Sequence, residues 1–405
     1  MFGVDKKYWF YIFPFVYYCN KGKQTFLYNT LSGENIEMNN PVVLNLLRSL
    51  HKKNNLGALV CKGSMLNQND VSEFISEFCK KKMGNIVDVE EMPEKPIQMM
   101  PILNLQCDLE KQRNYRAEIL QNLLELNIYI AENCKQNCQH CSKYYKQMLC
   151  CRCSERSEIL DISSLQNILS QIRFSVVGKI NILGGTLFLY SDLLKLKEIF
   201  TDVKDRTHFY IHYKNFEKNE ILYNFQTELI VNFPVNELIL DRVLSEINRE
   251  TTNLYFIIEN EEQYILAEQF IENRNIEKYK IKPFFNGENI DFFKKNIFVN
   301  KEDIFSKPLT MREIFRNQKL NFNFFGILHI FSDGSVKANP NTETLGNIKD
   351  DKILDLIYKE MLDNTAWRKI RNIYPCNECL YQELCPSPSN YELIIGKSNL
   401  CHVQP

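Results

Sequence analysis

The sequence predicts an α/β protein built around a parallel β-sheet, and three observations support this prediction. Strand and helix patterns alternate from residue 126 to about 290, short strands with a few helices fill residues 1–90, and a hairpin pattern lies near residues 326–340. Strands that alternate with helices are joined by crossover connections, which set the strands parallel. The chain has 405 residues, which is enough for about two or three domains.

The composition narrows the class of protein. The chain is 44% apolar and 24% charged, with 14 Gly and 13 Pro, which is typical of a globular protein. Its formal net charge is −1 and it has no block of like charges, so we expect no nucleic-acid partner. Fourteen cysteines are present, and seven of them form two tight groups at metal-ligand spacings. This pattern favours metal binding in a reducing compartment over a disulfide framework.

The N-terminal aromatic run, residues 8–18, follows Lys6 and Lys7. The run is too short to span a bilayer, and no small-residue cleavage site follows it, so a signal peptide is not expected. Aromatic runs of this length are typical of strands. We therefore expect a cytoplasmic protein with no membrane partner.

The next segment combines further short strands with helices. Strands are predicted at residues 25–29, 31–37 and 56–60, and helices at residues 42–50 and 69–82. Residues 91–105 hold three prolines and two adjacent methionines and are predicted to be a linker, followed by a helix over residues 109–124.

The alternating region predicts six strand–helix units. The predicted strands are residues 126–130, 179–183, 208–213, 228–232, 253–258 and 279–284, and the predicted helices are residues 160–172, 193–200, 235–247 and 261–273. In folds of this kind, cofactor sites lie at the C-terminal ends of the strands.

Three cysteines follow the first of these strands, at Cys134, Cys138 and Cys141. The C-x3-C-x2-C spacing lets three thiolates converge on one metal centre and leaves one coordination position open. Closely spaced cysteines are also the usual trace of an iron–sulfur cluster. The alternative is a zinc knuckle, completed by Cys150, Cys151 or Cys153, because both metals accept thiolates. These last three cysteines could also form a redox pair or lie buried in a loop.

The second strand ends in Gly184, Gly185 and Thr186. Two glycines allow close approach of the backbone to a ligand and leave peptide groups free to bind it. An ordinary turn at a strand end would also suit this pair.

The last group is Cys376, Cys379, Cys385 and Cys401. Four thiols form a closed tetrahedral set that suits zinc or an iron–sulfur cluster. A predicted hairpin with an Asp333–Gly334 turn precedes them.

Together these motifs resemble the radical S-adenosylmethionine (SAM) enzymes. The resemblance implies a partial (β/α)6 barrel in which Cys134, Cys138 and Cys141 hold a [4Fe–4S] cluster with one iron left to bind SAM. It implies that Gly184, Gly185 and Thr186 bind the methionine portion of SAM and that His140 lies near the adenine. The family usually has Gly-Gly-Glu at this strand end, so Thr186 removes a carboxylate that would help to hold the SAM ammonium group.

The C-terminal region resembles the SPASM extension of radical SAM peptide maturases, which normally holds two auxiliary clusters. The ligands of one cluster correspond to Cys376, Cys379, Cys385 and Cys401. The positions of the other fall near Phe324 or Phe325, at Asn339 or Pro340, and at Ser389, and no cysteine lies between residues 154 and 375. We therefore expect one auxiliary [4Fe–4S] centre, with a structural zinc ribbon as the alternative.

Residues 1–90 resemble, by topology alone, the winged-helix modules that grip the leader part of precursor peptides. Such a module would add an extended peptide as one more strand. The alternatives are a plain accessory domain and a DNA-binding winged helix, and the lack of a basic surface disfavours the second. The predicted domains are residues 1–90 for peptide recognition, 91–125 for linker and helix, 126–300 for the radical SAM barrel, and 301–405 for the SPASM domain.

The resemblance implies an enzyme that modifies a ribosomally made precursor peptide through a 5′-deoxyadenosyl radical and that needs an electron donor. No individual residue is assigned a catalytic role. The alternative is a degenerate member of the family that binds peptide as a scaffold for a partner maturase, which Thr186 and the missing cluster motivate. A metal-binding regulator is a third hypothesis.

Overall fold

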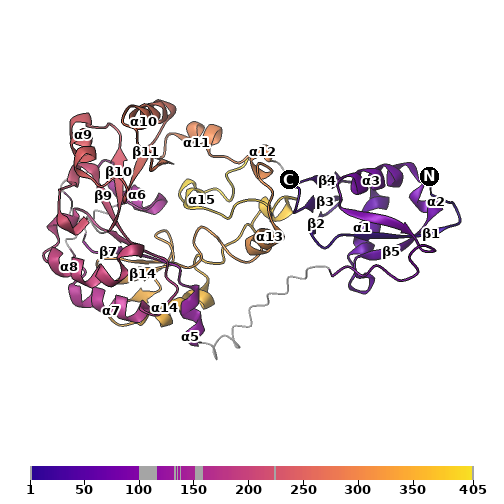
Figure 1. The fold of residues 1–405 in the computed structure, drawn as a ribbon, viewed down its shortest axis with the longest axis horizontal. Helices are drawn as coiled ribbons and strands as arrows, with labels where there is room; N and C mark the ends of the chain where they lie inside the picture. Colours follow the sequence, from indigo (N-terminus) through magenta and orange to yellow (C-terminus); the bar gives the residue numbers. More distant parts are fainter. Residues whose placement is uncertain are drawn as a thin grey trace.

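The computed structural model describes residues 2–99, 116–131, 134, 136, 138–150, 158–222 and 225–403. It shows a mixed α/β protein with one nine-stranded sheet and two three-stranded sheets (Figure 1). The large sheet has the order β12-β11-β10-β9-β8-β7-β13-β14-β15, and the small sheets have the orders β5-β1-β6 and β2-β3-β4.

The strands are β1 Lys7–Ile12, β2 Val16–Lys21, β3 Gln24–Asn29, β4 Asn35–Met38, β5 Ala58–Lys62, β6 Gly84–Asp88, β7 Glu125–Tyr129, β8 Lys179–Leu183, β9 Thr207–His212, β10 Gln226–Asn232, β11 Thr252–Ile258, β12 Tyr279–Pro283, β13 Ile327–Ile330, β14 Ser335–Lys337 and β15 Gly346–Asn347. The α-helices are α1 Pro41–Leu50, α2 Gly63–Leu66, α3 Asn69–Lys80, α5 Arg116–Ile119, α6 Cys141–Gln147, α7 Ile162–Ile172, α8 Leu193–Phe200, α9 Glu237–Glu246, α10 Glu261–Asn273, α11 Ile290–Asn296, α12 Lys301–Ile304, α13 Met311–Asn317, α14 Ile353–Asp363 and α15 Asn390–Ile395.

The predicted parallel sheet is confirmed for β7 to β12, whose neighbouring strands all pair in parallel. Alternate residues of each strand face opposite sides of the sheet. One side, which carries Leu126, Ile180 and Phe209, packs against α7 to α10 in the largest hydrophobic cluster. Figure 1 shows these helices along the outer side of the sheet. The opposite side of the sheet therefore forms the inner face.

The predicted hairpin is also confirmed, but its place in the fold was not foreseen. β13 and β14 pair in antiparallel fashion around Gly334, whose φ of +85° suits a turn glycine. β13 also pairs in parallel with β7, with Leu328 opposite Leu126. The C-terminal region thus continues the large sheet, because a second strand can pair with the free edge of β7.

The N-terminal region (residues 2–99) has its own hydrophobic cluster, in which Phe10 of β1 meets Phe74 and Phe78 of α3. Helix α1 begins after Asn40, whose side chain accepts hydrogen bonds from the backbone N–H groups of Val42 and Val43. Such a cap satisfies donors that the first turn leaves unpaired.

Two element predictions need correction. The single strand predicted over residues 8–18 is two strands, β1 and β2, which belong to different sheets. Pro14 lacks a backbone N–H group, and a turn with a Val16 N–H to Phe13 C=O bond of 3.1 Å separates them. The helix predicted over residues 109–124 is described only from residue 116. In this part α5 ends at Ile119, and a 3₁₀ turn over Leu120–Asn122 follows it. Part of the linker predicted over residues 91–105 lies outside the described residues.

Within the described part of the chain, none of the helices combines the length and the apolar character that crossing a bilayer requires.

Candidate functional site

The first candidate site lies where β7 ends and the chain runs on to the three-cysteine loop. Cys134, Cys138 and Cys141 are all partly buried, and Cys141 begins α6. The backbone N–H of Cys141 donates to the carbonyl of Cys138 at 3.0 Å, which makes a tight turn between these two residues. Residues 135 and 137 of this loop lie outside the described part of the chain.

A residue from another strand end reaches this loop. Asn215, which follows β9 in a 3₁₀ turn, donates from Nδ2 to the Cys134 sulfur at 3.2 Å. Hydrogen bonds to a ligand sulfur orient the thiolate and tune the metal that it holds. Asn215 was not predicted from the sequence, although a polar residue just after a parallel strand was a signal for it.

The end of β8 lies directly against the start of the loop. Gly184 has a φ of +124°, and a Cβ atom added there would lie 2.1 Å from the carbonyl oxygen of Ala131. The backbone N–H of Ile130 donates to the carbonyl of Leu183 at 2.8 Å. Gly185 also has a positive φ, +47°. Gly184 therefore permits an approach that a side chain would block, which places the Gly-Gly turn beside the cysteine loop.

Thr186 follows these glycines and is 5% exposed. Its hydroxyl oxygen is buried and has no hydrogen-bond partner among the residues that the structure describes. A buried hydroxyl without a partner costs free energy, so buried hydroxyls normally have one. A ligand that can form a hydrogen bond would satisfy this group.

His140 connects the loop to the ends of β11 and β12. Its Nε2 lies 3.8 Å from Oε1 of Glu259, which follows β11, and its ring centre lies 5.2 Å from that of Phe284, which follows β12. Glu259 Oε2 accepts a hydrogen bond of 2.8 Å from Asn286. His140 was predicted from the sequence, whereas Glu259 and Phe284 were not.

Another polar pair lies at neighbouring strand ends. His212 at the end of β9 and Asn232 at the end of β10 are 2.7 Å apart between Nε2 and Oδ1. His212 Nδ1 accepts a hydrogen bond from the backbone N–H of Lys214. Burial lowers the pKa of His212 to about 4, so the ring is neutral near pH 7.

The inner face of the sheet below these residues is apolar. Tyr129, Leu183, Ile230 and Phe284 form part of a separate hydrophobic cluster. Cys150 belongs to this cluster and is 2% exposed, which agrees with a buried loop position. Cys151 and Cys153 lie outside the described residues. Nearer the start of the strands, buried polar side chains follow, among them Asn181, which donates to Oδ1 of Asn127 at 2.6 Å.

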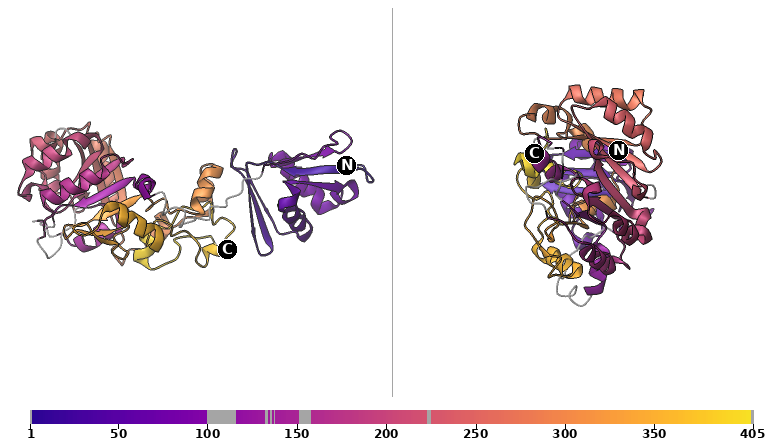
Figure 2. Two further views of the ribbon diagram at one scale, coloured as in Figure 1. Left: turned by 90° about the horizontal axis from the view of Figure 1, so that it is seen from below. Right: turned by 90° about the vertical axis from the view of Figure 1, so that its left-hand side faces the viewer.

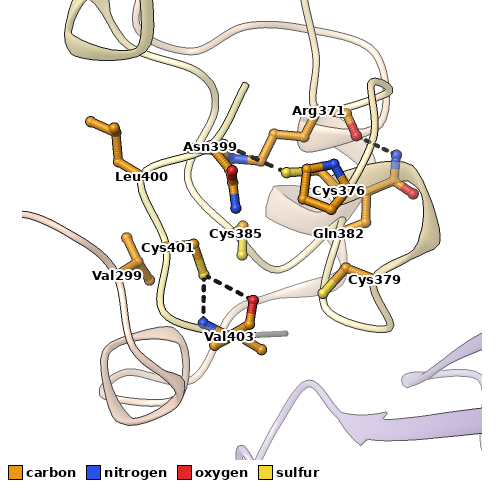
Figure 3. A pocket seen from close by; sticks show the side chains of 11 residues that line it. Val299, Arg371, Cys376, Cys379, Gln382, Cys385, Asn399, Leu400, Cys401 and Val403 are labelled. Carbon is orange, nitrogen blue, oxygen red and sulfur yellow. Dashed lines mark hydrogen bonds between the residues drawn. The ribbon is translucent and has the colours of Figure 1, made fainter. Parts of the chain in front are cut away.

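The second candidate site is a pocket near the C-terminus (Figure 3). Its lining includes all four cysteines of the predicted closed set, and the lining residues are Val299, Arg371, Pro375, Cys376, Cys379, Gln382, Cys385, Asn399, Leu400, Cys401 and Val403. The space between them that no protein atom fills is about 420 Å³, part of it open to solvent. The spacing in the sequence therefore brings the four thiols to one place.

Backbone and side-chain donors point at these sulfurs. The N–H of Tyr381 lies 3.4 Å from the sulfur of Cys379, and the N–H of Val403 lies 3.2 Å from that of Cys401. Burial raises the pKa of the Cys385 thiol to about 12 and also raises the pKa of Cys379 and Cys401. Without a cation these thiols keep their protons, and a bound metal would displace the protons.

As they stand, no three His, Cys, Asp or Glu side chains of the described residues are close enough together to hold a metal ion. The donor chemistry of the four C-terminal thiols and the N–H groups aimed at their sulfurs nevertheless fit a thiolate-bound metal. Binding would require the sulfurs to move closer together.

Where the resemblance places the other auxiliary cluster, the described residues form a network of asparagines instead. Asn339 is 1% exposed and donates to Oδ1 of Asn390 at 2.7 Å. Asn341 donates to the same oxygen at 3.1 Å and to the carbonyl of Lys146 in α6 at 2.7 Å. Ser389 caps α15 through a bond from the N–H of Tyr391. Hydrogen bonds between amides hold these loops together.

A third candidate surface is a charged hollow in the N-terminal region, where the space that no protein atom fills is about 1320 Å³, part of it open to solvent. Its lining residues are Ser32, Glu34, Glu73, Ser76, Glu77, Lys80, Lys81 and Lys82. It lies between α3 and the turn before β4, and β4 is an edge strand of its sheet.

The fold is similar to that of SuiB from Streptococcus suis. A crystal structure of SuiB aligns with 97% of this chain and 100% of its own, with a TM-score of 0.50 and 14% identity. SuiB bound to the precursor peptide SuiA (97% and 99% covered, TM-score 0.49, 14% identity) and bound to S-adenosylmethionine (96% and 98% covered, TM-score 0.48, 13% identity) also match. No family model and no curated protein matches the sequence. The structural similarity confirms the sequence resemblance at the level of fold.

Proposed function

We propose that this chain is a radical SAM enzyme that modifies a ribosomally made precursor peptide. The observation that carries the proposal is the junction of β7 and β8. The three-cysteine loop leaves one strand, and the Gly184 turn lies against it. The hydroxyl of Thr186 in this turn has no hydrogen-bond partner in the described part of the chain. A ligand that binds both the open coordination position of the metal and the polar groups of this turn would occupy this place.

Different residues of the chain would have different roles at this site. Cys134, Cys138 and Cys141 would hold the [4Fe–4S] cluster, with Asn215 orienting the first thiolate. The Gly184–Thr186 segment would bind the methionine portion of SAM. When bound, the cluster and SAM together supply the 5′-deoxyadenosyl radical that removes a hydrogen atom from the peptide.

The remaining regions would serve recognition and electron supply. Residues 1–90 would act as a winged-helix-like module that adds the peptide to the free edge of β4, beside the charged hollow. Residues 301–405 would act as a SPASM domain with one auxiliary centre on the four C-terminal thiols. SuiB has been crystallised with S-adenosylmethionine and with a precursor peptide, and we carry these two ligand classes over to this chain.

A second function, a peptide-binding scaffold for a partner maturase, is favoured by Thr186. The hydroxyl can form a hydrogen bond with an ammonium group but cannot offer the charge-assisted contact of a carboxylate. Such a scaffold would need peptide and partner but no SAM cleavage.

The deciding experiment is anaerobic reconstitution with iron and sulfide, followed by SAM and a strong reductant as electron donor. We expect 5′-deoxyadenosine to form and to be absent in a Cys138→Ala variant. Iron should approach roughly eight per chain, as two four-iron clusters require. If the reconstituted wild type releases no 5′-deoxyadenosine, the enzyme proposal fails and the scaffold function takes its place.

A further inference from the structure

The sheet β2-β3-β4 buries both of its faces. Alternate residues of a strand face opposite sides. Val16, Leu27 and Ile36 pack into the core of the N-terminal region. Tyr17, Cys19, Phe26 and Tyr28 form a different cluster with residues 299–314 and 379–385 of the C-terminal region. Figures 1 and 2 show this sheet beside α12, α13 and the chain's C-terminal end.

One of the two segments that pack on this face of the sheet is the loop of residues 376–385, which we name the docking loop. Tyr381 packs edge-on against Phe26, with ring centres 5.3 Å apart and planes at 84°. Lys21 of β2 donates to the carbonyl of Asn377 at 2.8 Å and to Oε1 of Gln382 at 2.7 Å. Leu380 and Leu384 complete the apolar contact.

The same loop carries three of the four C-terminal thiols. Cys376 and Cys385 are its two ends, and Cys379 lies between them. Apart from one 3₁₀ turn over Cys376–Glu378 it has no regular secondary structure. Its thiols line the candidate metal pocket, while Leu380, Tyr381 and Leu384 belong to the cluster with Phe26. Figure 3 shows the strands of the N-terminal region passing close to Cys379.

The residues on either side of the fourth thiol, Cys401, form hydrogen bonds with Val299, which begins the second segment that packs on the sheet (residues 299–314). Val299 N–H donates to the carbonyl of Leu400 at 2.9 Å, and His402 N–H donates to the carbonyl of Val299 at 2.9 Å. Residues 299–305 therefore follow the position of Cys401. Residues 299–314 contact the sheet through Phe305, whose ring centre lies 6.0 Å from that of Phe26 and 6.2 Å from that of Tyr28. They add an exposed ion pair between Lys301 and Glu37 and a bond from the Leu309 N–H to the Tyr28 hydroxyl. Exposed ion pairs add little stability.

We propose that a metal held by Cys376, Cys379, Cys385 and Cys401 fixes the docking loop, so that occupancy of this centre sets whether the N-terminal region is docked. The inference rests on the metal-binding part of the proposed function and does not depend on SAM cleavage. The hydrogen bonds inside this loop are short-range turn bonds, such as those from Cys379 N–H to the Cys376 carbonyl at 3.2 Å and from Leu384 N–H to the Tyr381 carbonyl at 2.9 Å. A metal that draws the four sulfurs together would add links between the two ends of the loop and Cys401. The peptide-recognition region would then be held in place by the C-terminal centre.

The test compares full-length variants in the iron-reconstituted and zinc-loaded states. Cys376→Ser/Cys401→Ser removes the metal, and neither thiol belongs to the cluster with Phe26. Tyr381→Ala removes the ring contact of the docking loop with Phe26 and keeps every thiol. Cys79→Ser, in the N-terminal core, controls for the loss of a cysteine. Metal content, hydrogen exchange of residues 16–38 and the radius of gyration from solution scattering are measured.

We expect the double variant and Tyr381→Ala to show exchange at least about fivefold faster over residues 16–29 and a larger radius, because undocking exposes one face of the sheet. Cys79→Ser should match the wild type. A metal-free double variant with wild-type exchange and radius would overturn the inference, and so would a Tyr381→Ala variant that stays docked. Loss of SAM cleavage with metal-dependent docking intact would count against the proposed function alone.

Discussion

At the scale of single residues, the buried hydroxyl of Thr186 is the sharpest pointer to a ligand. It lies at the end of β8, beside the glycine that touches the cysteine loop, and none of the described residues forms a hydrogen bond with it. Its neighbours at the other strand ends, Asn215 and Glu259, already have contacts with the loop. A small set of side chains at strand ends therefore defines the site.

A Thr186→Val substitution keeps the shape of the side chain and removes the hydroxyl. We expect SAM to bind about fivefold more weakly, since one neutral hydrogen bond contributes about 1 kcal/mol. Equilibrium dialysis with the reconstituted protein measures this. Thr186→Ser retains the hydroxyl and should bind SAM like the wild type. Equal affinity for the valine variant would show that Thr186 does not contact SAM.

His329 in β13 makes a pH dependence expected. It is 7% exposed, and burial lowers its pKa from 6.5 to about 3. The unfolded chain therefore binds a proton below pH 6.5 that the folded chain refuses until about pH 3. The contribution of neutral His329 is fully present above pH 6.5 and is lost as the pH falls through this window.

The measurement is urea unfolding at pH 7.5 and pH 5.5. At the lower pH the protonation of His329 in the unfolded chain should cost about 1.4 kcal/mol. A His329→Gln variant lacks the titrating group and should lose correspondingly less stability between the two conditions. Identical losses in variant and wild type would contradict the assignment.

At the scale of elements, the contact of β8 with the end of β7 depends on one glycine. Gly184→Ala would place a methyl group 2.1 Å from the Ala131 carbonyl in a backbone conformation that L-residues rarely adopt. We expect the strand ends to separate, with SAM binding reduced at least about tenfold and stability reduced by about 2 kcal/mol or more. Calorimetry and thermal unfolding measure the two effects.

Gly178→Ala is the matched control for this change. Gly178 lies just before β8, and a Cβ atom added there would meet nothing within 4 Å. The control should bind SAM normally and unfold near the wild-type temperature. Similar losses in both variants would mean that the approach of Gly184 to Ala131 has no special role.

At the scale of the whole molecule, two groups of thiols lie in separate places. One lies at the strand ends of the large sheet, and the other lines the pocket beside the N-terminal region. The asparagine network around Asn339 and Asn390 occupies the region where the resemblance would place a further cluster. The number of metal centres that we propose therefore follows from which loops carry cysteines.

Iron content should separate the two centres. We expect Cys138→Ala to lower iron from about eight to about four per chain and to abolish SAM cleavage. Cys376→Ser/Cys401→Ser should lose a similar amount of iron and still bind SAM at the first site. Iron and acid-labile sulfide assays check both variants. About twelve irons in the wild type would require a third cluster and would contradict the assignment.

The sequence by itself determined most elements of the large sheet and the grouping of the thiols. Strand propensity, helix caps such as Asn260, and cysteine spacing act over short stretches of chain, so they can be read locally. The tertiary structure alone decided how distant segments meet. It placed β13 beside β7, Asn215 beside Cys134, and Phe26 against Tyr381. These contacts join residues far apart in the chain, and their free energy comes from packing and pairing that no local pattern records.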